Sequence, residues 1–149
     1  MERAVVREDP DVAVRALGAS WAVLEIQGPW AMAGDLAEKV RALAGLPPGA
    51  RGSAAHITGQ VHLSTGRVED AAAPLHEALA SFREAADRRG EVLVHIDLAL
   101  LSGTRTAIPQ AFAHLAEARA LLPDLGDLRL VGVVEAFAGD LQMTGGEME

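Results

Sequence analysis

The stretch TGQVHLSTGRVE at residues 58–69 recurs eighty positions later as AGDLQMTGGEME at residues 138–149. Both glycines of the first stretch are repeated in the second, Gly59 as Gly139 for example, and the apolar residues keep their places. Similarity at a fixed interval of 20 to 50 residues is typical of an array of one supersecondary unit. If eighty residues correspond to two units, each unit is about forty residues long.

Two further matches agree with an interval of forty residues. Three small or apolar positions recur once at that spacing: Ala71, Leu75 and Ala78 correspond to Ala111, Leu115 and Ala118. A weaker match aligns residues 83–97 with residues 3–17 and places Val92 opposite Val12. Alanine-rich helices can resemble one another by chance, but three matches at multiples of one interval favour a true repeat.

Helical periodicity recurs along the whole chain, whereas strand-type alternation of apolar residues never persists between turn residues. Half of the residues are hydrophobic but only 3% are aromatic. Small side chains at helical spacing let helix backbones approach closely. The predicted fold class is therefore all-α, with one domain over residues 1–149. About seven helices are expected, over residues 10–26, 30–44, 53–64, 68–89, 91–101, 107–122 and 127–143.

Local signals set the predicted helix ends. Asp9 is expected to cap the first helix, Gly90 to close the fourth and Pro123 to stop the sixth. Arg88 and Arg89, the only adjacent basic pair, are expected near a helix C-terminus, where positive charge is favourable. The connections are short, so consecutive helices are expected to pack as antiparallel hairpins.

These hairpins resemble the tetratricopeptide repeat, which carries small residues in both of its helices and often a closing proline. The residues that carry the resemblance are Gly59, Ala71 and Ala78 in one unit and Ala99, Ala111, Ala118 and Pro123 in the next. Leu17 and Gly18 followed by Trp21 are similar to the leucine, glycine and aromatic residue of the family's first helix. The units exceed the family's usual length of about 34 residues, and His62 and Gln142 stand where a tyrosine is expected. Units of this longer kind look like those in the helical arrays of large bacterial ATP-dependent transcription activators.

The resemblance implies a right-handed superhelix of stacked hairpins, whose first helices line a concave groove for a protein or peptide. Carried over residue by residue, it places nine side chains along that groove: Arg15, His56, Gln60, Ser64, Ile96, Leu100, Phe137, Asp140 and Met143. This strip is polar in the second unit and apolar in the later ones. Such a strip suits an extended or helical peptide with a few apolar anchors.

Both ends of the chain are expected to fall inside a repeat, as in a segment cut from a longer array. The end of such an array needs a polar capping helix. Five apolar residues of the last predicted helix would then stay partly uncovered: Val131, Val134, Phe137, Leu141 and Met143. The first four are the candidates for self-association. Exposed apolar patches usually mark interfaces, so an alternative partner is a second copy that pairs through the terminal helices.

Composition narrows the class of partner and the compartment. The formal net charge of -8 argues against direct binding of nucleic acid, which needs clustered lysine and arginine. No apolar run reaches the ~20 residues of a membrane span, so no membrane association is expected. The chain has no cysteine, which is compatible with a reducing cytoplasm. One lysine against twelve arginines hints at a GC-rich bacterial genome.

Residue patterns for catalysis or metal binding are missing from the sequence. His76 begins a zinc-protease-like pattern, but Ala80 stands where the second histidine would fall. The only lysine, Lys39, lies within a predicted helix, and no phosphate-binding loop accompanies it. Acidic neighbours such as Glu69 with Asp70, and Asp124 with Asp127, are expected to stabilise helix starts. We therefore expect no catalytic residues, no metal and no cofactor.

The sequence thus predicts a protein-interaction module, part of a bacterial regulatory or adaptor protein, that binds a partner segment in its groove. Self-assembly through open helical ends is the second hypothesis. An enzyme or a metal-binding helical protein is the third, because titrating groups from distant helices could converge in a pocket that the sequence does not reveal.

Overall fold

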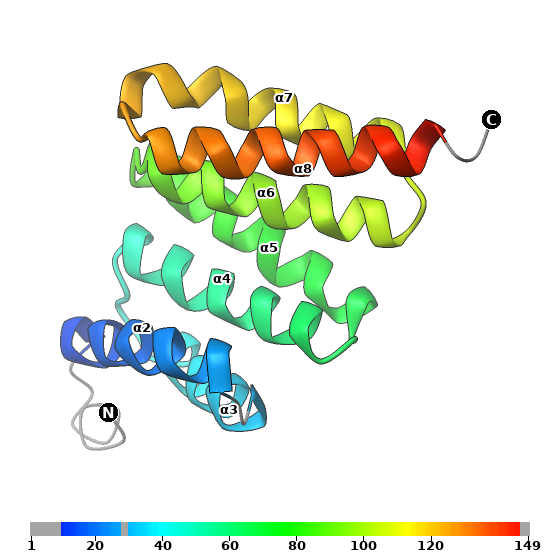
Figure 1. Cartoon of the computed structure of the whole chain (residues 1–149). Coiled ribbons are helices and arrows are strands. Elements are labelled where there is room, and N and C mark those ends of the chain that lie inside the picture. The colour runs from blue at the N-terminus through cyan, green and yellow to red at the C-terminus, as the bar shows by residue number, and fades with distance from the viewer. Residues whose placement is uncertain (1–9, 28–29, 147–149) are drawn as a thin grey trace. The chain divides into compact units, whose positions relative to one another are not determined.

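The computed structural model describes residues 10–27 and 30–146, and in these residues it contains seven α-helices and no strand (Figure 1). The helices are α2 (Pro10–Gln27), α3 (Trp30–Arg41), α4 (Pro48–Ser64), α5 (Val68–Glu84), α6 (Arg88–Thr104), α7 (Ile108–Leu125) and α8 (Leu128–Gly146). The predicted all-α class is confirmed. Asp9, the expected cap of the first helix, lies outside the described residues.

The chain divides into two compact units between Ala86 and Asp87. The first contains α2 to α5 and the second contains α6 to α8. Within each unit, helices that follow one another in sequence pack as antiparallel hairpins (Figure 1). The single domain expected over residues 1–149 stays a prediction.

The forty-residue interval is visible in the helix boundaries. Helices α4, α6 and α8 begin at residues 48, 88 and 128, and helices α5 and α7 begin at residues 68 and 108. The turns repeat as well, since Gly66 and Thr106 have φ values of 75° and 58°. Left-handed backbone is unusual for a threonine, so the turn geometry, more than residue type, is what the repeat retains.

The break between α5 and α6 falls earlier than predicted. Helix α5 ends at Glu84, whereas Gly90, the expected helix end, lies inside α6 and is buried. The side chain of Asp87 accepts a hydrogen bond of 2.9 Å from the Gly90 amide and so caps α6. Ala86 has a φ of 55° and completes the turn. The N-cap carboxylate satisfies an otherwise unpaired amide, which outweighs the tendency of glycine to end a helix.

Prolines begin one helix and fail to stop another. Helix α4 starts at Pro48, five residues earlier than predicted, because a proline at the first position loses no helical hydrogen bond. Helix α7 continues past Pro123 to Leu125 and ends at Gly126, which has a φ of 61°. Like any proline inside a helix, Pro123 removes one hydrogen bond, and α7 tolerates this loss in its last turn.

The basic pair was placed at the wrong helix end. Arg88 and Arg89 are the first residues of α6 and not the last of a helix. Arg88 donates to Asp124 at 2.6 Å, and Arg89 donates to Asp127. Asp124 also departs from its prediction, since it lies in the last turn of α7 and not at a helix start. The pair of Arg88 with Asp124 offsets the unfavourable helix dipole at the start of α6 and at the end of α7.

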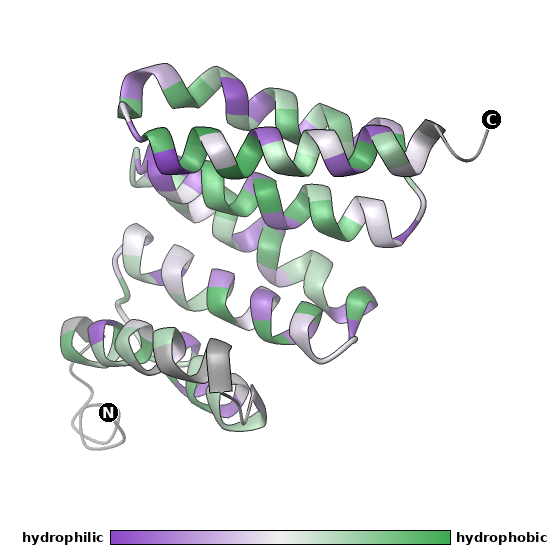
Figure 2. Ribbon diagram, viewed as in Figure 1, coloured by the Kyte–Doolittle hydropathy of each residue, from purple (hydrophilic) through white to green (hydrophobic). Residues whose placement is uncertain are grey.

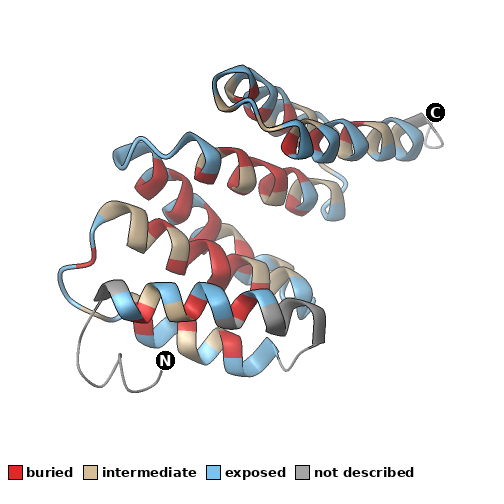
Figure 3. Cartoon of the chain, turned by 60° about the vertical axis from the view of Figure 1, so that its left-hand side comes forward, coloured by how far each residue is buried: buried red, intermediate tan, exposed pale blue. Residues whose placement is uncertain are grey.

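Each unit has its own apolar core. In the first, α2, α3 and α4 contribute nine buried residues: Ala13, Leu17, Trp21, Ala33, Ala37, Val40, Ala54, Ile57 and Val61. In the second, α6, α7 and α8 contribute ten: Val92, Ile96, Ala99, Ala111, Leu115, Ala118, Leu122, Leu130, Val134 and Ala138. Of the buried residues marked in Figure 3, many lie along α4 and few along α8.

The burial pattern corrects the weakest of the three repeat matches. Val12 was aligned with Val92, but Val12 is 42% exposed and Val92 is fully buried. Of the described side chains of α2, those that are buried are instead Ala13, Leu17 and Trp21, and the first of these lies one position after Val12. Helices α2 and α6 are both amphipathic. An alignment that is wrong by one residue therefore still matches apolar residues with each other, although it pairs an exposed residue with a buried one.

Apolar residues recur along the coloured parts of the helices (Figure 2). None of the described helices combines the length and the hydropathy that crossing a membrane requires.

Candidate partner-binding site

A recess in the second unit brings together three of the predicted groove residues. It lies between α6 and α8, beside the start of α7, and has a volume of about 280 Å³. Its lining is Ala99, Leu100, Gly103, Thr104, Ile108, Phe137, Asp140, Leu141 and Thr144. We refer to it as the α6–α8 recess. Leu100, Phe137 and Asp140 were predicted as groove residues, and Leu141 was predicted for self-association. The other five lining residues were not predicted as site residues.

The floor of the α6–α8 recess is apolar. Phe137 and Leu141 are half-buried and pack on the core of the second unit, while Leu100 is 39% exposed. A Cβ atom added to Gly103 would lie 3.3 Å from a methyl carbon of Leu141, so the two helices approach closely here. The recess therefore presents an apolar surface made by two helices.

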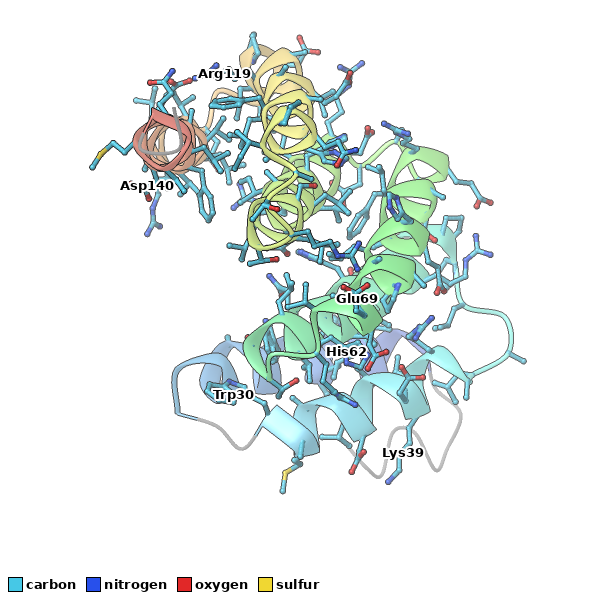
Figure 4. All side chains as sticks on the ribbon, turned by 90° about the vertical axis from the view of Figure 1, so that its right-hand side faces the viewer. Trp30, Lys39, His62, Glu69, Arg119 and Asp140 are labelled. Carbon is cyan, nitrogen blue, oxygen red and sulfur yellow. The ribbon has the colours of Figure 1, made fainter. Side chains whose placement is uncertain are left out.

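The rim of the α6–α8 recess is polar and carries one charge. The hydroxyl groups of Thr104 and Thr144 donate to the backbone oxygens of Leu101 and Asp140, at 2.7 and 3.0 Å. The carboxylate of Asp140 is exposed on α8 (Figure 4). A ligand with a positive charge next to an apolar anchor would match this arrangement.

The other predicted groove residues of the second unit lie elsewhere. Ile96 is only 6% exposed and belongs to the core. Met143 is 72% exposed and does not line the α6–α8 recess. Adjacent positions on one helix point in different directions. The groove residues carried over from the tetratricopeptide resemblance therefore include both buried and exposed side chains, because a small error in helix register changes which side chain faces the groove.

In the first unit, Arg15 lines a different recess of about 420 Å³ with Val14, Pro47, Gly49, Ala50 and Ser53. His56 is 8% exposed and meets the ring of Phe82 edge-on, with 6.3 Å between the ring centres. His56 is therefore part of the packing between α4 and α5. Gln60 is half-buried, and Ser64 is exposed at the end of α4.

A third recess, of about 590 Å³, lies between α3 and α4 and was not foreseen. Its polar lining includes Asp35, Glu38, His62 and Arg67. Burial of the His62 ring lowers its pKa, and the nearby Arg67 lowers that pKa further. These side chains come from three separate segments with no shared motif, so the sequence offered no signal for them.

Of the candidates for self-association, only Val134 departs from the expectation that they stay partly uncovered. Val134 is fully buried in the core of the second unit, and Val131, Phe137 and Leu141 are half-buried against that core. The most exposed large apolar residues of α8 are Leu128 at 84% and Met143 at 72%. Contacts of α8 with α6 and α7 decided which of its faces is covered.

Two histidines form an interhelical contact that was also not foreseen. The Nδ1 atoms of His95 on α6 and His114 on α7 lie 3.2 Å apart, so one ring donates to the other. The residues that the structure describes contain no group of three histidine, aspartate or glutamate side chains placed to hold a metal ion. Lys39 points away from the body of the first unit (Figure 4).

A scan against models of known protein families finds no match, and a search of curated proteins finds none either. The tetratricopeptide resemblance therefore stays a prediction from the sequence. The structure shows helical hairpins whose boundaries repeat at an interval of forty residues.

Proposed function

We propose that the chain is a protein-interaction module that binds a segment of a partner protein at the α6–α8 recess. The observation that supports this proposal most directly is an apolar floor beside a single exposed carboxylate, Asp140. The volume of about 280 Å³ lies at the lower end of small-molecule and cofactor sites, which span roughly 300 to 1,000 Å³. One or two apolar side chains of a peptide suit that volume.

The negative charge of the chain indicates which charge the partner segment carries. The chain has a formal net charge of -8, and Asp140 stands at the rim of the recess. Opposite charges accelerate encounter and favour one class of partner over another. The proposed partner segment therefore carries a lysine or arginine next to its apolar anchor. We place the module in a cytoplasmic bacterial regulator or adaptor, in keeping with its composition.

A peptide library displayed on phage and selected against the full chain tests the proposal. The expected result is a recovered consensus with an apolar anchor beside a basic residue. Leu100→Glu should weaken binding of the consensus peptide at least tenfold, because it places a charge at the mouth of the recess. Asp140→Asn should reduce the preference for the basic residue without abolishing binding.

Val12→Glu is the matched control, because Val12 is 42% exposed, close to the 39% of Leu100, and lies in the first unit. It should leave the peptide affinity unchanged. A consensus that binds the Leu100→Glu variant as tightly as the unchanged chain would refute the role of the recess.

Self-association is the second candidate function, favoured by the exposure of Leu128 and Met143 on α8. It predicts a mass that rises with protein concentration in sedimentation experiments. Substitution of both residues by glutamate should then give a monomer at every concentration. A constant monomer mass for the unchanged chain would exclude it.

A further inference from the structure

Two glycines of helix α8 stand at the same repeat positions as two glycines of helix α4. Counting forty residues per repeat, Gly52 and Gly59 of α4 correspond to Gly132 and Gly139 of α8. In both helices the glycines are seven residues apart and therefore lie on one face. What these glycines do in α4 indicates what the same face of α8 can receive.

The glycines of α4 receive large side chains of α5. A Cβ atom on Gly52 would lie 2.7 Å from the ring of Phe82, and one on Gly59 would lie 2.6 Å from Leu75. Neither position tolerates a side chain while α5 stays in place. The two α5 residues are also seven positions apart, so the helices fit as antiparallel partners, with the earlier α5 residue opposite the later glycine.

The next repeat uses the same arrangement with different volumes. Val92 and Ala99 of α6 occupy the glycine places, and Leu115 and Leu122 of α7 occupy the places of Leu75 and Phe82. All four side chains belong to the core of the second unit. Two hairpins of the chain therefore share one rule, in which the second helix presents two large apolar side chains seven residues apart.

The corresponding face of α8 is open. A Cβ atom on either Gly132 or Gly139 would meet no atom within 4 Å. The opposite face is covered, because Leu130, Val134 and Ala138 are buried in the core of the second unit. Helix α4 is covered on both of its faces, by α2 and α3 on one and by α5 on the other.

The open face of α8 is flanked by exposed apolar and charged residues. We define the open face as Gly132, Ala136, Gly139 and Met143, the last of which is 72% exposed. Arg129, at the start of α8, corresponds to Arg89 of α6, which pairs with Asp127. In the hairpin of α6 and α7, Asp127 follows Leu122, the second large apolar residue, by five residues. A helix that packs on α8 would therefore gain an ion pair with Arg129 if it carried an acidic residue five positions after its own second large apolar residue.

We propose that the open face of α8 binds an amphipathic helix of a partner protein, antiparallel to α8. That helix presents a leucine opposite Gly139, a leucine or aromatic residue seven positions later opposite Gly132, and an acidic residue five positions after that, near Arg129. This inference does not rest on the α6–α8 recess, which is lined by other residues of α8, such as Phe137 and Asp140.

The chain itself supplies a probe of the required chemistry. A synthetic peptide of residues 67–87 contains Leu75, Phe82 and, five residues after the latter, Asp87. Fluorescence anisotropy of the labelled peptide, titrated with the full chain, measures the affinity. We expect saturable binding, weakened at least tenfold by Gly139→Leu in the chain and by the double change Leu75→Ala and Phe82→Ala in the peptide.

Three further changes, two in the chain and one in the peptide, make the result specific. Gly18→Leu is the matched control, because Gly18 also lies in a helix with no atom within 4 Å of an added Cβ, and the affinity should not change. Arg129→Gln in the chain and Asp87→Asn in the peptide should each weaken binding severalfold. Combined, they should weaken it no more than either alone. Circular dichroism melting curves confirm that each variant is folded.

Three results would overturn the proposal. The first is absence of saturable binding up to about 1 mM peptide, and the second is equal affinity for the unchanged chain and the Gly139→Leu variant. The third is a dimer in sedimentation experiments that Gly139→Leu converts to a monomer, because the occupant would then be a second copy. None of these results bears on peptide binding at the α6–α8 recess, which Leu100→Glu tests separately.

Discussion

The two complete hairpins with matching repeats, α4 with α5 and α6 with α7, place large apolar side chains at the same positions of the second helix but differ in what faces them on the first. In the first, the glycines Gly52 and Gly59 make room for Phe82 and Leu75. In the second, larger residues on the first helix face two leucines of α7. The comparison indicates that the repeat retains the two large side chains of the second helix, while the residues that face them on the first helix vary from glycine to valine.

The largest expected effect is the loss of stability caused by a cavity, which we compare between the α4–α5 and the α6–α7 interfaces. Leu75 and Leu115 are equivalent and fully buried, so replacement of either by alanine should lower the free energy of unfolding by about 2–5 kcal/mol. Leu75→Ala should cost more, because Leu75 packs on Gly59, which has no side chain to relax into the cavity. Urea denaturation of both variants measures the difference. Equal costs would show that the glycine does not matter.

A middle-sized effect tests whether volume is interchangeable between the interfaces. Gly52→Val should destabilise the chain by about 1–3 kcal/mol through overpacking, because its Cβ would lie 2.7 Å from Phe82. Adding Phe82→Leu recreates the pairing of Val92 with Leu122 and should restore more than half of the loss. If the second change instead adds to the first in urea denaturation, the two interfaces are not equivalent.

The carboxylates of Asp87 and Asp127, which cap α6 and α8, allow the same comparison at the turns before these helices. Asp87→Ala should cost about 1 kcal/mol, since Asp87 accepts one hydrogen bond, from the Gly90 amide. Asp127 accepts from the amides of Arg129 and Leu130, at 3.0 and 3.2 Å, and from Arg89. Asp127→Ala should therefore lower the melting temperature further than Asp87→Ala does, and the reverse order would contradict this account.

The Asp127 cap also predicts a dependence on pH. The hydrogen bond from Arg89, followed by those from the backbone amides, lowers the pKa of Asp127 below its ordinary value of 3.8. Its stabilising contribution is therefore fully present above pH 3.8 and is lost as the pH falls through the lower pKa of the folded state. Between pH 7 and pH 3 the melting temperature should fall more for the unchanged chain than for Asp127→Ala.

The smallest effect compares a filled and an open glycine site. Gly139→Ala should stabilise the chain by at most about 1 kcal/mol, because alanine favours a helix and meets no neighbouring atom. Gly59→Ala should destabilise it, because the added methyl group would lie 2.6 Å from Leu75. Thermal melting of both variants measures the signs. A loss of stability in Gly139→Ala would mean that its site is already occupied.

The repeat could be predicted from the sequence because it depends on the spacing of residues along the chain. The match of Gly59 with Gly139 and of Leu75 with Leu115 depends only on sequence spacing, and the helix boundaries follow it. Individual ends were less accurate, as at Gly90 and Pro123, because a cap or a position near a terminus changes what such a residue does.

The candidate site could be predicted only in part. Leu100, Phe137 and Asp140 were expected to share a surface, and they do line one recess. Histidine was expected to be accessible at position 56, yet that ring packs on Phe82. The contact of His95 with His114 joins two helices, and no spacing within one helix could have indicated it.

The amino-acid sequence by itself determined the helical class and the forty-residue interval, because periodicity and turn residues act over a few positions. Only the tertiary structure decided which face of each helix is covered. Val134 and Leu128 are apolar residues of the same helix, yet one is fully buried and the other is 84% exposed. That difference depends on where neighbouring helices lie, and helix packing is set by contacts between residues far apart in the chain.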